Sequence, residues 1–142
     1  MKYIEIQGLK IAPTFHVNIE EVDIFNGTPR DSMYCPIALK TKKLTPIIFD
    51  KNPLINHIWT NVSNDMISFS VKLTNGDMLS ILYKLSRRAV AFIKRFDKNS
   101  SDDINPITIV PTLYQVKRYY HKSRHDDMLY NFDKGGIQDV AK

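Results

Sequence analysis

The sequence predicts an α+β fold: an antiparallel sheet of four to five strands with two or three helices packed on one face. Three observations lead to this prediction. Residues 54–83 contain three runs rich in β-branched and aromatic residues, as strands are. Arg87–Lys98 has the spacing of an amphipathic helix, whose apolar stripe must face the sheet. Cys35-Pro36 has the form of a helix start, because proline is favoured at the first helical position.

The first elements are predicted to be short. Lys2–Gln7 reads as a strand that ends at Gly8, and Phe15–Ile19 as a second strand. Glu20–Phe25 begins with acidic residues and is followed by Asn26-Gly27, a common helix stop. We therefore expect one or two helical turns there, followed by a loop.

A second helix is predicted to begin at Pro36. Lysines at 40, 42 and 43 suit its C-terminal end, where cations interact favourably with the helix dipole. Pro46 and Pro53 then predict a loop, since proline disrupts a helix interior.

The middle of the chain gives the clearest strand signals, at Leu54–Val62, Met66–Leu73 and Met78–Tyr83. In the second run, apolar residues alternate with serine and lysine, which is typical of a half-buried strand. Asn75-Gly76 joins the second run to the third. This dipeptide predicts a type I′ hairpin, whose two central residues both need positive φ.

The last predicted helix has Ser86 as its N-cap and continues from Arg87 to about Lys98. Ile107–Leu113 is predicted as a final strand, and Pro111 within it favours an edge position. We expect residues 1–120 to form a single domain. Residues 121–142 are expected to be a polar C-terminal tail, either flexible or ordered by a partner.

The composition suits one globular domain of 142 residues, with 43% hydrophobic and 25% charged residues. No window approaches the roughly 18 apolar residues that a membrane span needs, and Glu5 interrupts any N-terminal apolar segment. A single cysteine suits a reducing cytoplasm, the expected location. The net charge of +5 is compatible with an anionic partner.

Several landmarks resemble a family of small phage and bacterial proteins of uncharacterised function. The matching segments are Glu21–Gly27, Cys35-Pro36-Ile37-Ala38-Leu39, Ile67–Tyr83, Phe92-Ile93-Lys94-Arg95-Phe96-Asp97 and Pro106–Ile109. The similarity spans roughly residues 17–110, and this chain has extra residues at about 44–56 and 99–105. The resemblance implies an α+β fold and a mobile-element setting, with host cytoplasm as the location. It implies no reaction and no catalytic residue.

Cys35 allows two interpretations. At a helix N-terminus, free N–H groups and the dipole favour a thiolate, and a nucleophile would then need His16 or His57 as its base. Alternatively, Cys35 is a small apolar residue that packs inward with Ile37 and Leu39. We favour packing, because no cysteine-hydrolase signature surrounds the thiol.

Five cations are expected on the face of the last helix that lies opposite its apolar stripe: Arg87, Arg88, Lys94, Arg95 and Lys98. Such a cluster can neutralise phosphates, giving binding that weakens steeply with salt. The alternative is an ordinary solvated helix face without a ligand.

A second basic stretch combines cations and tyrosines between Tyr114 and His125. Its candidate binding residues are Lys117, Arg118, Tyr119, Tyr120, Lys122 and Arg124. Aromatic rings among cations suit nucleic acid, and tyrosine with arginine also suits a protein interface. Plain packing of the tyrosines on the domain is the third possibility.

Other chemistries have little support in the sequence. His121 and His125 have helical metal-ligand spacing, but no third ligand is evident. No glycine-rich phosphate loop occurs, and the adjacent pairs Asp102/Asp103 and Asp126/Asp127 read as turn residues. Trp59 reads as a core or interface residue. The sequence predicts no metal and no cofactor.

We therefore expect a non-enzymatic, phage-type accessory protein. Its basic, tyrosine-rich surface would bind a host or defence protein, or an anionic ligand such as a nucleotide. One alternative is a nucleic-acid-binding protein that uses the basic helix face. The other is an oligomeric phage structural protein, which would make the chain a homo-oligomer.

Overall fold

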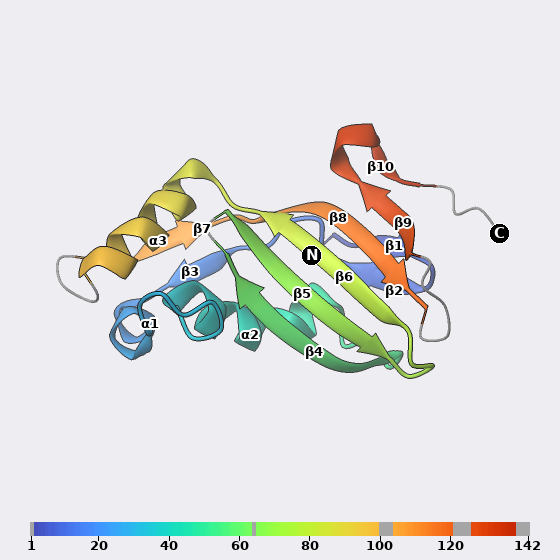
Figure 1. Cartoon of the computed structure of the whole chain (residues 1–142), viewed down its shortest axis with the longest axis horizontal. Helices are drawn as coiled ribbons and strands as arrows, with labels where there is room; N and C mark the ends of the chain where they lie inside the picture. The colour runs from blue at the N-terminus through green and yellow to red at the C-terminus, as the bar shows by residue number, and fades with distance from the viewer. Residues whose placement is uncertain (1, 64, 100–103, 121–125, 139–142) are drawn as a thin grey trace.

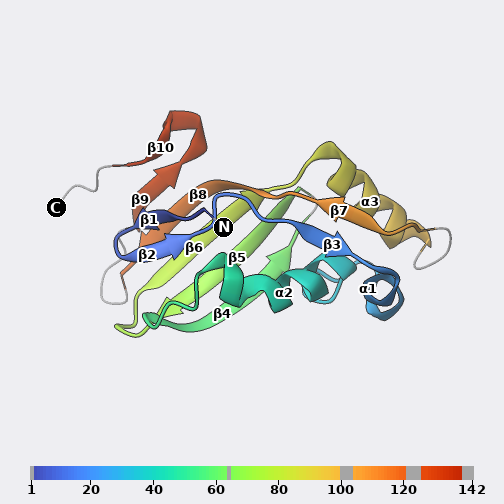
Figure 2. The ribbon, with the colours of Figure 1, turned by 180° about the vertical axis from the view of Figure 1, so that it is seen from behind.

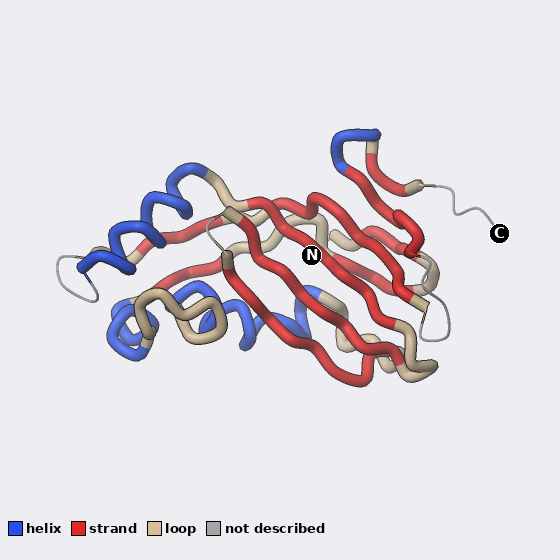
Figure 3. The backbone as a smooth tube through the Cα atoms, viewed as in Figure 1, coloured by secondary structure: helices blue, strands red, loops and turns tan. Residues whose placement is uncertain are grey.

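The computed structural model describes residues 2–63, 65–99, 104–120 and 126–138, and strands dominate it (Figure 3). The central element is a six-stranded antiparallel sheet in the order β10-β9-β8-β6-β5-β4. Two further two-stranded sheets pair β1 with β2 and β3 with β7. The predicted fold class is therefore wrong: the protein is mostly β, and its main sheet does not have four to five strands with helices packed on one face.

The strands are bounded as follows: β1 Ile4–Ile6, β2 Leu9–Ile11, β3 Val17–Ile19, β4 Ile55–Val62, β5 Met66–Leu73, β6 Met78–Lys84, β7 Ile107–Ile109, β8 Thr112–Tyr119, β9 Asp126–Asn131 and β10 Gly136–Ile137. The helices are α1 Glu21–Asn26, α2 Pro36–Ile48 and α3 Arg87–Asn99, with a 3₁₀ turn η1 at Phe132–Lys134. No helix in the described ranges is long and apolar enough to cross a membrane.

One face of the main sheet is covered and the other is not. Seen from behind, α2, β1 and β2 cross in front of the sheet (Figure 2). The opposite face is turned toward the viewer in Figure 1, and no helix lies over its strands. The helix α3 lies beyond the end of the sheet at which β6 finishes (Figure 1). The expectation of helices on one face fails because short N-terminal strands supply much of the cover.

The core fills the space between the sheet and this covering layer. Inward residues of β5 and β6, such as Phe69 and Tyr83, are fully buried together with Phe15 and Phe49 from the covering layer. The ring of Tyr83 meets Phe15 edge-on at 4.9 Å and Phe69 at 5.7 Å, an arrangement that aromatic pairs favour. Alternation of apolar and polar residues along the strands produces this one-sided burial.

The three strong strand predictions in the middle of the chain are confirmed by β4, β5 and β6. The turn between β5 and β6 differs from the prediction. Gly76 has a positive φ of 93°, but Asn75 does not have a positive φ. The Gly76 N–H donates to Leu73 O, and the Leu73 N–H donates to Asp77 O. This is a three-residue loop closed by a left-handed residue. The two-residue turn with positive φ at both positions occurs instead at Gln7-Gly8, between β1 and β2.

Pro46 was predicted to lie in a loop, and this prediction is wrong: α2 continues through it to Ile48. A proline inside a helix leaves the carbonyl oxygen four residues earlier without its usual N–H donor. Here the Thr45 hydroxyl donates to Lys42 O at 3.1 Å and replaces that donor. The helix also ends within a turn of Pro46, so few further bonds are affected.

The predicted edge strand Ile107–Leu113 divides at Pro111. Its first part is β7, which pairs with β3, and its second part begins β8. The strand β8 lies between β6 and β9, so its predicted edge position is wrong. Proline can stand here because it falls between two strands and not within one.

The segment expected as a polar tail contributes β9 and β10 to the main sheet, with the 3₁₀ turn η1 between them. Gly135 closes η1 with a φ of 85°. Residues 121–125 and 139–142 of the expected tail lie outside the described residues.

Candidate functional site

The helix α3 presents the predicted cationic surface. The Ser86 hydroxyl accepts a hydrogen bond from the Ala89 N–H at 3.2 Å, which confirms the predicted N-cap. Ala89, Phe92, Ile93 and Phe96 are buried on the inner side. All five candidate cations are exposed on the opposite side, within an arc of about 120° around the helix axis. We call this set, Arg87, Arg88, Lys94, Arg95 and Lys98, the α3 basic face.

The charges of the α3 basic face are not neutralised by nearby carboxylates among the described residues. None of its five cations forms an ion pair with any residue that the structure describes. Asp97 on the same helix is engaged elsewhere: its carboxylate accepts the Arg30 backbone N–H at 2.8 Å, and its carbonyl oxygen accepts the Arg30 guanidinium at 2.5 Å. The positive charge of this face therefore points to solvent without internal compensation.

Shallow grooves border the α3 basic face on both sides. One groove, of about 270 Å³, is lined by Arg88 and Arg95 together with Ile104–Ile107. The other, of about 330 Å³, is lined by Arg87, Lys94 and Val90. Each groove places two cations beside apolar side chains, an arrangement that can hold a phosphate while its ester carbons contact the apolar wall.

The second basic stretch is divided by the sheet. Lys117, Arg118 and Tyr119 lie on β8, and Tyr120 follows it. The Arg118 guanidinium donates to Gln7 Oε1 at 2.6 Å on the covered side of the sheet. The Tyr120 hydroxyl donates to Asp127, and this bond raises the pKa of Tyr120. Lys122 and Arg124 lie outside the described residues, as does the His121/His125 pair. The structure therefore does not bring this stretch together as one surface.

Lys117 and Tyr119 point to the uncovered side of the sheet, together with His57 and Trp59, to which the sequence analysis assigned no ligand-binding role. Trp59 is 42% exposed and Tyr119 is 41% exposed. The ring of His57 contacts the Trp59 ring edge-on at 4.2 Å. We call the set His57, Trp59, Ser70, Lys72, Lys117 and Tyr119 the open sheet face. Its signal in the sequence is the polar half of the strand alternation, which by itself predicts only a half-buried strand.

Cys35 is buried and serves as the N-cap of α2. The Ala38 N–H donates to its Sγ at 3.4 Å. Burial raises the pKa of the Cys35 thiol above its ordinary value of 9.0, which disfavours the thiolate that nucleophilic chemistry needs. Cys35 itself lines a pocket of about 370 Å³ together with Arg30, Asp31 and Asp97, but neither His16 nor His57 lines it. The described residues also contain no group of three or more potential metal ligands.

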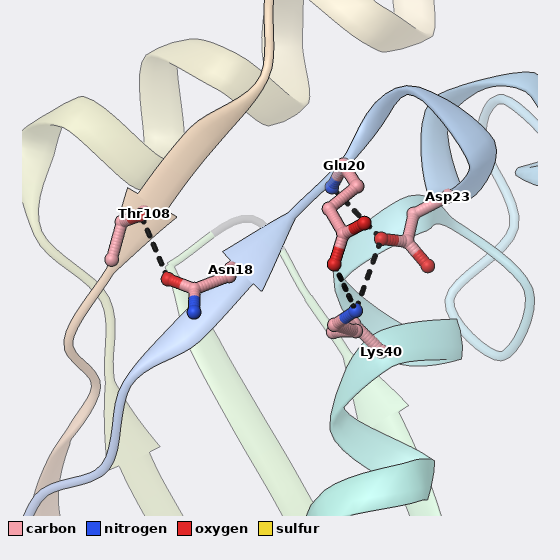
Figure 4. Close-up of polar contacts among 5 residues, drawn as sticks. All are labelled: Asn18, Glu20, Asp23, Lys40 and Thr108. Carbon is pink, nitrogen blue, oxygen red and sulfur yellow. Dashed lines mark hydrogen bonds and ion pairs between the residues drawn. The ribbon is translucent and has the colours of Figure 1, made fainter.

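Near α1, Lys40 forms ion pairs with Glu20 and Asp23 that hold elements of the fold together. Lys40 of α2 lies 3.0 Å from the Glu20 carboxylate and 3.7 Å from that of the buried Asp23 (Figure 4). Asp23 also accepts the Glu20 backbone N–H at 2.8 Å, which caps the first turn of α1. In the same region, Thr108 on β7 donates to Asn18 on β3 at 2.8 Å (Figure 4). These contacts join α1 to α2 and β3 to β7.

Comparison with protein-family models, curated proteins and solved structures finds no match to this chain. The arguments about its function therefore rest on its own residues.

Proposed function

We propose that this chain is a binding protein whose α3 basic face holds the phosphate backbone of a nucleic acid. The observation that carries the proposal is the exposure of five cations on one helix face with no ion pair to any described residue. A face of this kind releases condensed counterions when it meets a polyanion, and this release drives association. The proposal assigns no catalytic residue.

Counterion release of this kind has a quantitative signature. Each phosphate neutralised contributes about −0.9 to the slope of log K against log salt for a duplex and about −0.7 for a single strand. Full use of five cations therefore predicts a slope of about −4.5 or about −3.5 respectively. Backbone contacts carry little sequence information, and we expect similar affinities for oligonucleotides of different sequence.

The test is fluorescence anisotropy of labelled 20-nucleotide DNA and RNA, single- and double-stranded, between 50 and 300 mM salt. We expect the double variant Lys94→Glu/Arg95→Glu to weaken binding at least tenfold and to flatten the salt dependence. Lys43→Glu/Lys51→Glu is the matched control, since it changes the net charge equally at exposed positions away from α3. Equal losses in both double variants, or no binding at 50 mM salt, would reject the proposal.

A second candidate function is binding of a host or defence protein, and exposed apolar residues on α1 favour it. Phe25 is 80% exposed and Val22 is 54% exposed. Both line a groove of about 530 Å³ that includes Ile104, and Ile104 also lines one of the grooves beside the α3 basic face. Aromatic and arginine side chains together are typical protein-interface anchors.

The two candidates separate in a pull-down from lysate treated with nuclease. A protein partner should remain bound after nuclease and should be lost with Phe25→Asp. Partners that disappear with nuclease and persist with Phe25→Asp would support the nucleic-acid function instead. The phage-type setting implied by the family resemblance stays a prediction, as does cytoplasmic location.

A further inference from the structure

We propose that the open sheet face binds the unpaired bases of a single-stranded nucleic acid, with Trp59 and Tyr119 as stacking platforms. This inference rests on the proposed function, since the α3 basic face would hold the backbone of the same ligand. It adds the class of nucleic acid, single-stranded, and a second contact surface on another element.

The face is built by strand register. Trp59 on β4 is the Cα partner of Ser70 on β5, which pairs with Ser80 on β6 and so with Lys117 on β8. The next row runs from His57 through Lys72 and Met78 to Tyr119. All these side chains are exposed or half-buried, whereas inward neighbours such as Phe69 and Ile81 are buried. Both rows therefore lie on the side of the sheet turned toward the viewer in Figure 1.

The two large aromatic rings are placed across the face and not beside each other. Three strand spacings of about 4.8 Å separate β4 from β8, and the two residues lie one row, about 7 Å, apart along the strands. The Cα atoms of Trp59 and Tyr119 therefore stand roughly 16 Å apart. The edge-on contact of His57 with Trp59 supports the indole from one side. Aromatic rings held on a sheet at such separations can stack different bases of one strand.

The charge of the face selects an anionic ligand. No aspartate or glutamate occurs anywhere in β4, β5, β6 or β8. Lys72 and Lys117 stand among the aromatic rings, and Lys84 lies over the ring of Tyr114 near the start of α3. The nearest acid in these rows is Asp126 on β9, opposite Tyr119 at the rim. Serine hydroxyls at positions 68, 70 and 80 add hydrogen-bond donors and acceptors between the cations.

A single strand fits this chemistry better than a duplex does. The bases of a duplex are already stacked and paired, so their faces cannot reach a side chain on a sheet. Unpaired bases have free faces, and stacking on an aromatic ring is tolerant of sequence. We therefore expect a preference for single strands that the α3 basic face alone would not produce.

The test uses Trp59 itself, because it is the only tryptophan in the chain. The intact protein is titrated with a thymidine decanucleotide and with an abasic decamer of equal charge. Trp59 emission is recorded alongside the anisotropy of labelled oligonucleotide. We expect quenching by the decanucleotide and little quenching by the abasic strand. Trp59→Ala and Tyr119→Ala should each weaken decanucleotide binding by about 5- to 150-fold.

Two control variants keep the test decisive. Trp59→Phe retains an aromatic ring and should keep most of the affinity, which separates stacking from loss of fold. Tyr34→Ala removes an exposed ring next to the start of α2, outside the residues that form the face, and should leave affinity unchanged. Unfolding curves for each variant confirm that the variants are folded.

The outcomes distinguish this inference from the proposed function. Binding without quenching, insensitive to Trp59→Ala but lost in Lys94→Glu/Arg95→Glu, would overturn the sheet-face inference and leave the proposed function standing. If the decanucleotide quenches Trp59 in Lys94→Glu/Arg95→Glu as strongly as in the unmodified protein, base stacking is upheld. The proposal that the α3 basic face holds the backbone is then rejected. Failure of every oligonucleotide to bind would overturn both.

Discussion

The hydroxyl of Tyr83 on β6 donates a hydrogen bond of 2.5 Å to the backbone carbonyl oxygen of Ala12, which lies in the layer covering the sheet. Tyr83 is fully buried, so its hydroxyl has no access to water. Burial raises the pKa of Tyr83 far above its ordinary value of 10.0. A single side chain thus ties the main sheet to the segment between β2 and β3.

Tyr83→Phe should destabilise the protein by about 1–3 kcal/mol, because it leaves a buried carbonyl oxygen without its donor. Tyr3→Phe is the matched control. It removes a similar bond to Ile47 O at an exposed site, where water can replace the hydroxyl. Urea unfolding followed by circular dichroism measures both effects. Equal decreases in the free energy of unfolding for the two variants would show that the buried Tyr83 bond stabilises the protein no more than the exposed Tyr3 bond does.

Stability should fall at alkaline pH. Burial raises the pKa of Cys35 above 9.0 and that of Tyr83 above 10.0, whereas both groups titrate near those values in the unfolded chain. Above pH 9 the unfolded state therefore binds fewer protons than the folded state, and the free energy of unfolding decreases as pH rises. Melting temperatures should be nearly constant from pH 7 to 8.5 and decline beyond. In Tyr83→Phe the decline above pH 10 should be shallower, and an unchanged slope would contradict this assignment.

Lys40→Met should destabilise the protein by about 1–2 kcal/mol. The variant leaves the Asp23 carboxylate, only 3% exposed, without its cation. The loss is smaller than for a fully buried pair, because Lys40 is partly exposed and Asp23 keeps the Glu20 N–H. Lys10→Met removes an ion pair at 4.0 Å with Asp50, both about half exposed, and should have almost no effect. Chemical denaturation of the two variants checks this; a larger loss for Lys10→Met would refute it.

The thiol of Cys35 should react more slowly than free cysteine. Its burial limits access of reagent, and its raised pKa reduces the thiolate fraction at neutral pH. Iodoacetamide labelling of the native protein at pH 7.5, followed by mass spectrometry, measures the rate. Labelling in denaturant gives the rate of the accessible thiol for comparison. A native rate equal to or above that of free cysteine would restore the nucleophile interpretation.

Local features of the chain were predictable because they depend on neighbouring residues. Runs rich in β-branched and aromatic residues identified β4, β5 and β6, with clear alternation in β5, and helical spacing identified α3 with its exposed cations. Ser86 and Cys35 were recognised as helix starts, since capping needs only the next few residues. The composition of the candidate site on α3 was therefore readable from the sequence.

The arrangement of the strands was not predictable in this way. The strand β8 pairs with β6 and β9, and nothing within its own residues specifies either partner. Likewise, Pro46 can stand inside α2 because the Thr45 hydroxyl donates a hydrogen bond to Lys42 O. The presence of a proline in the sequence does not reveal this bond.

The amino-acid order alone thus established where the helices begin, the strands β4, β5 and β6, and the cations of α3, since each follows from residues close together in the chain. Only the tertiary structure decided that Arg118 turns to the covered side, while Lys117 and Tyr119 lie on the same uncovered face as Trp59. The physical reason is that strand register, which assigns every side chain to one face, depends on contacts between residues far apart along the chain.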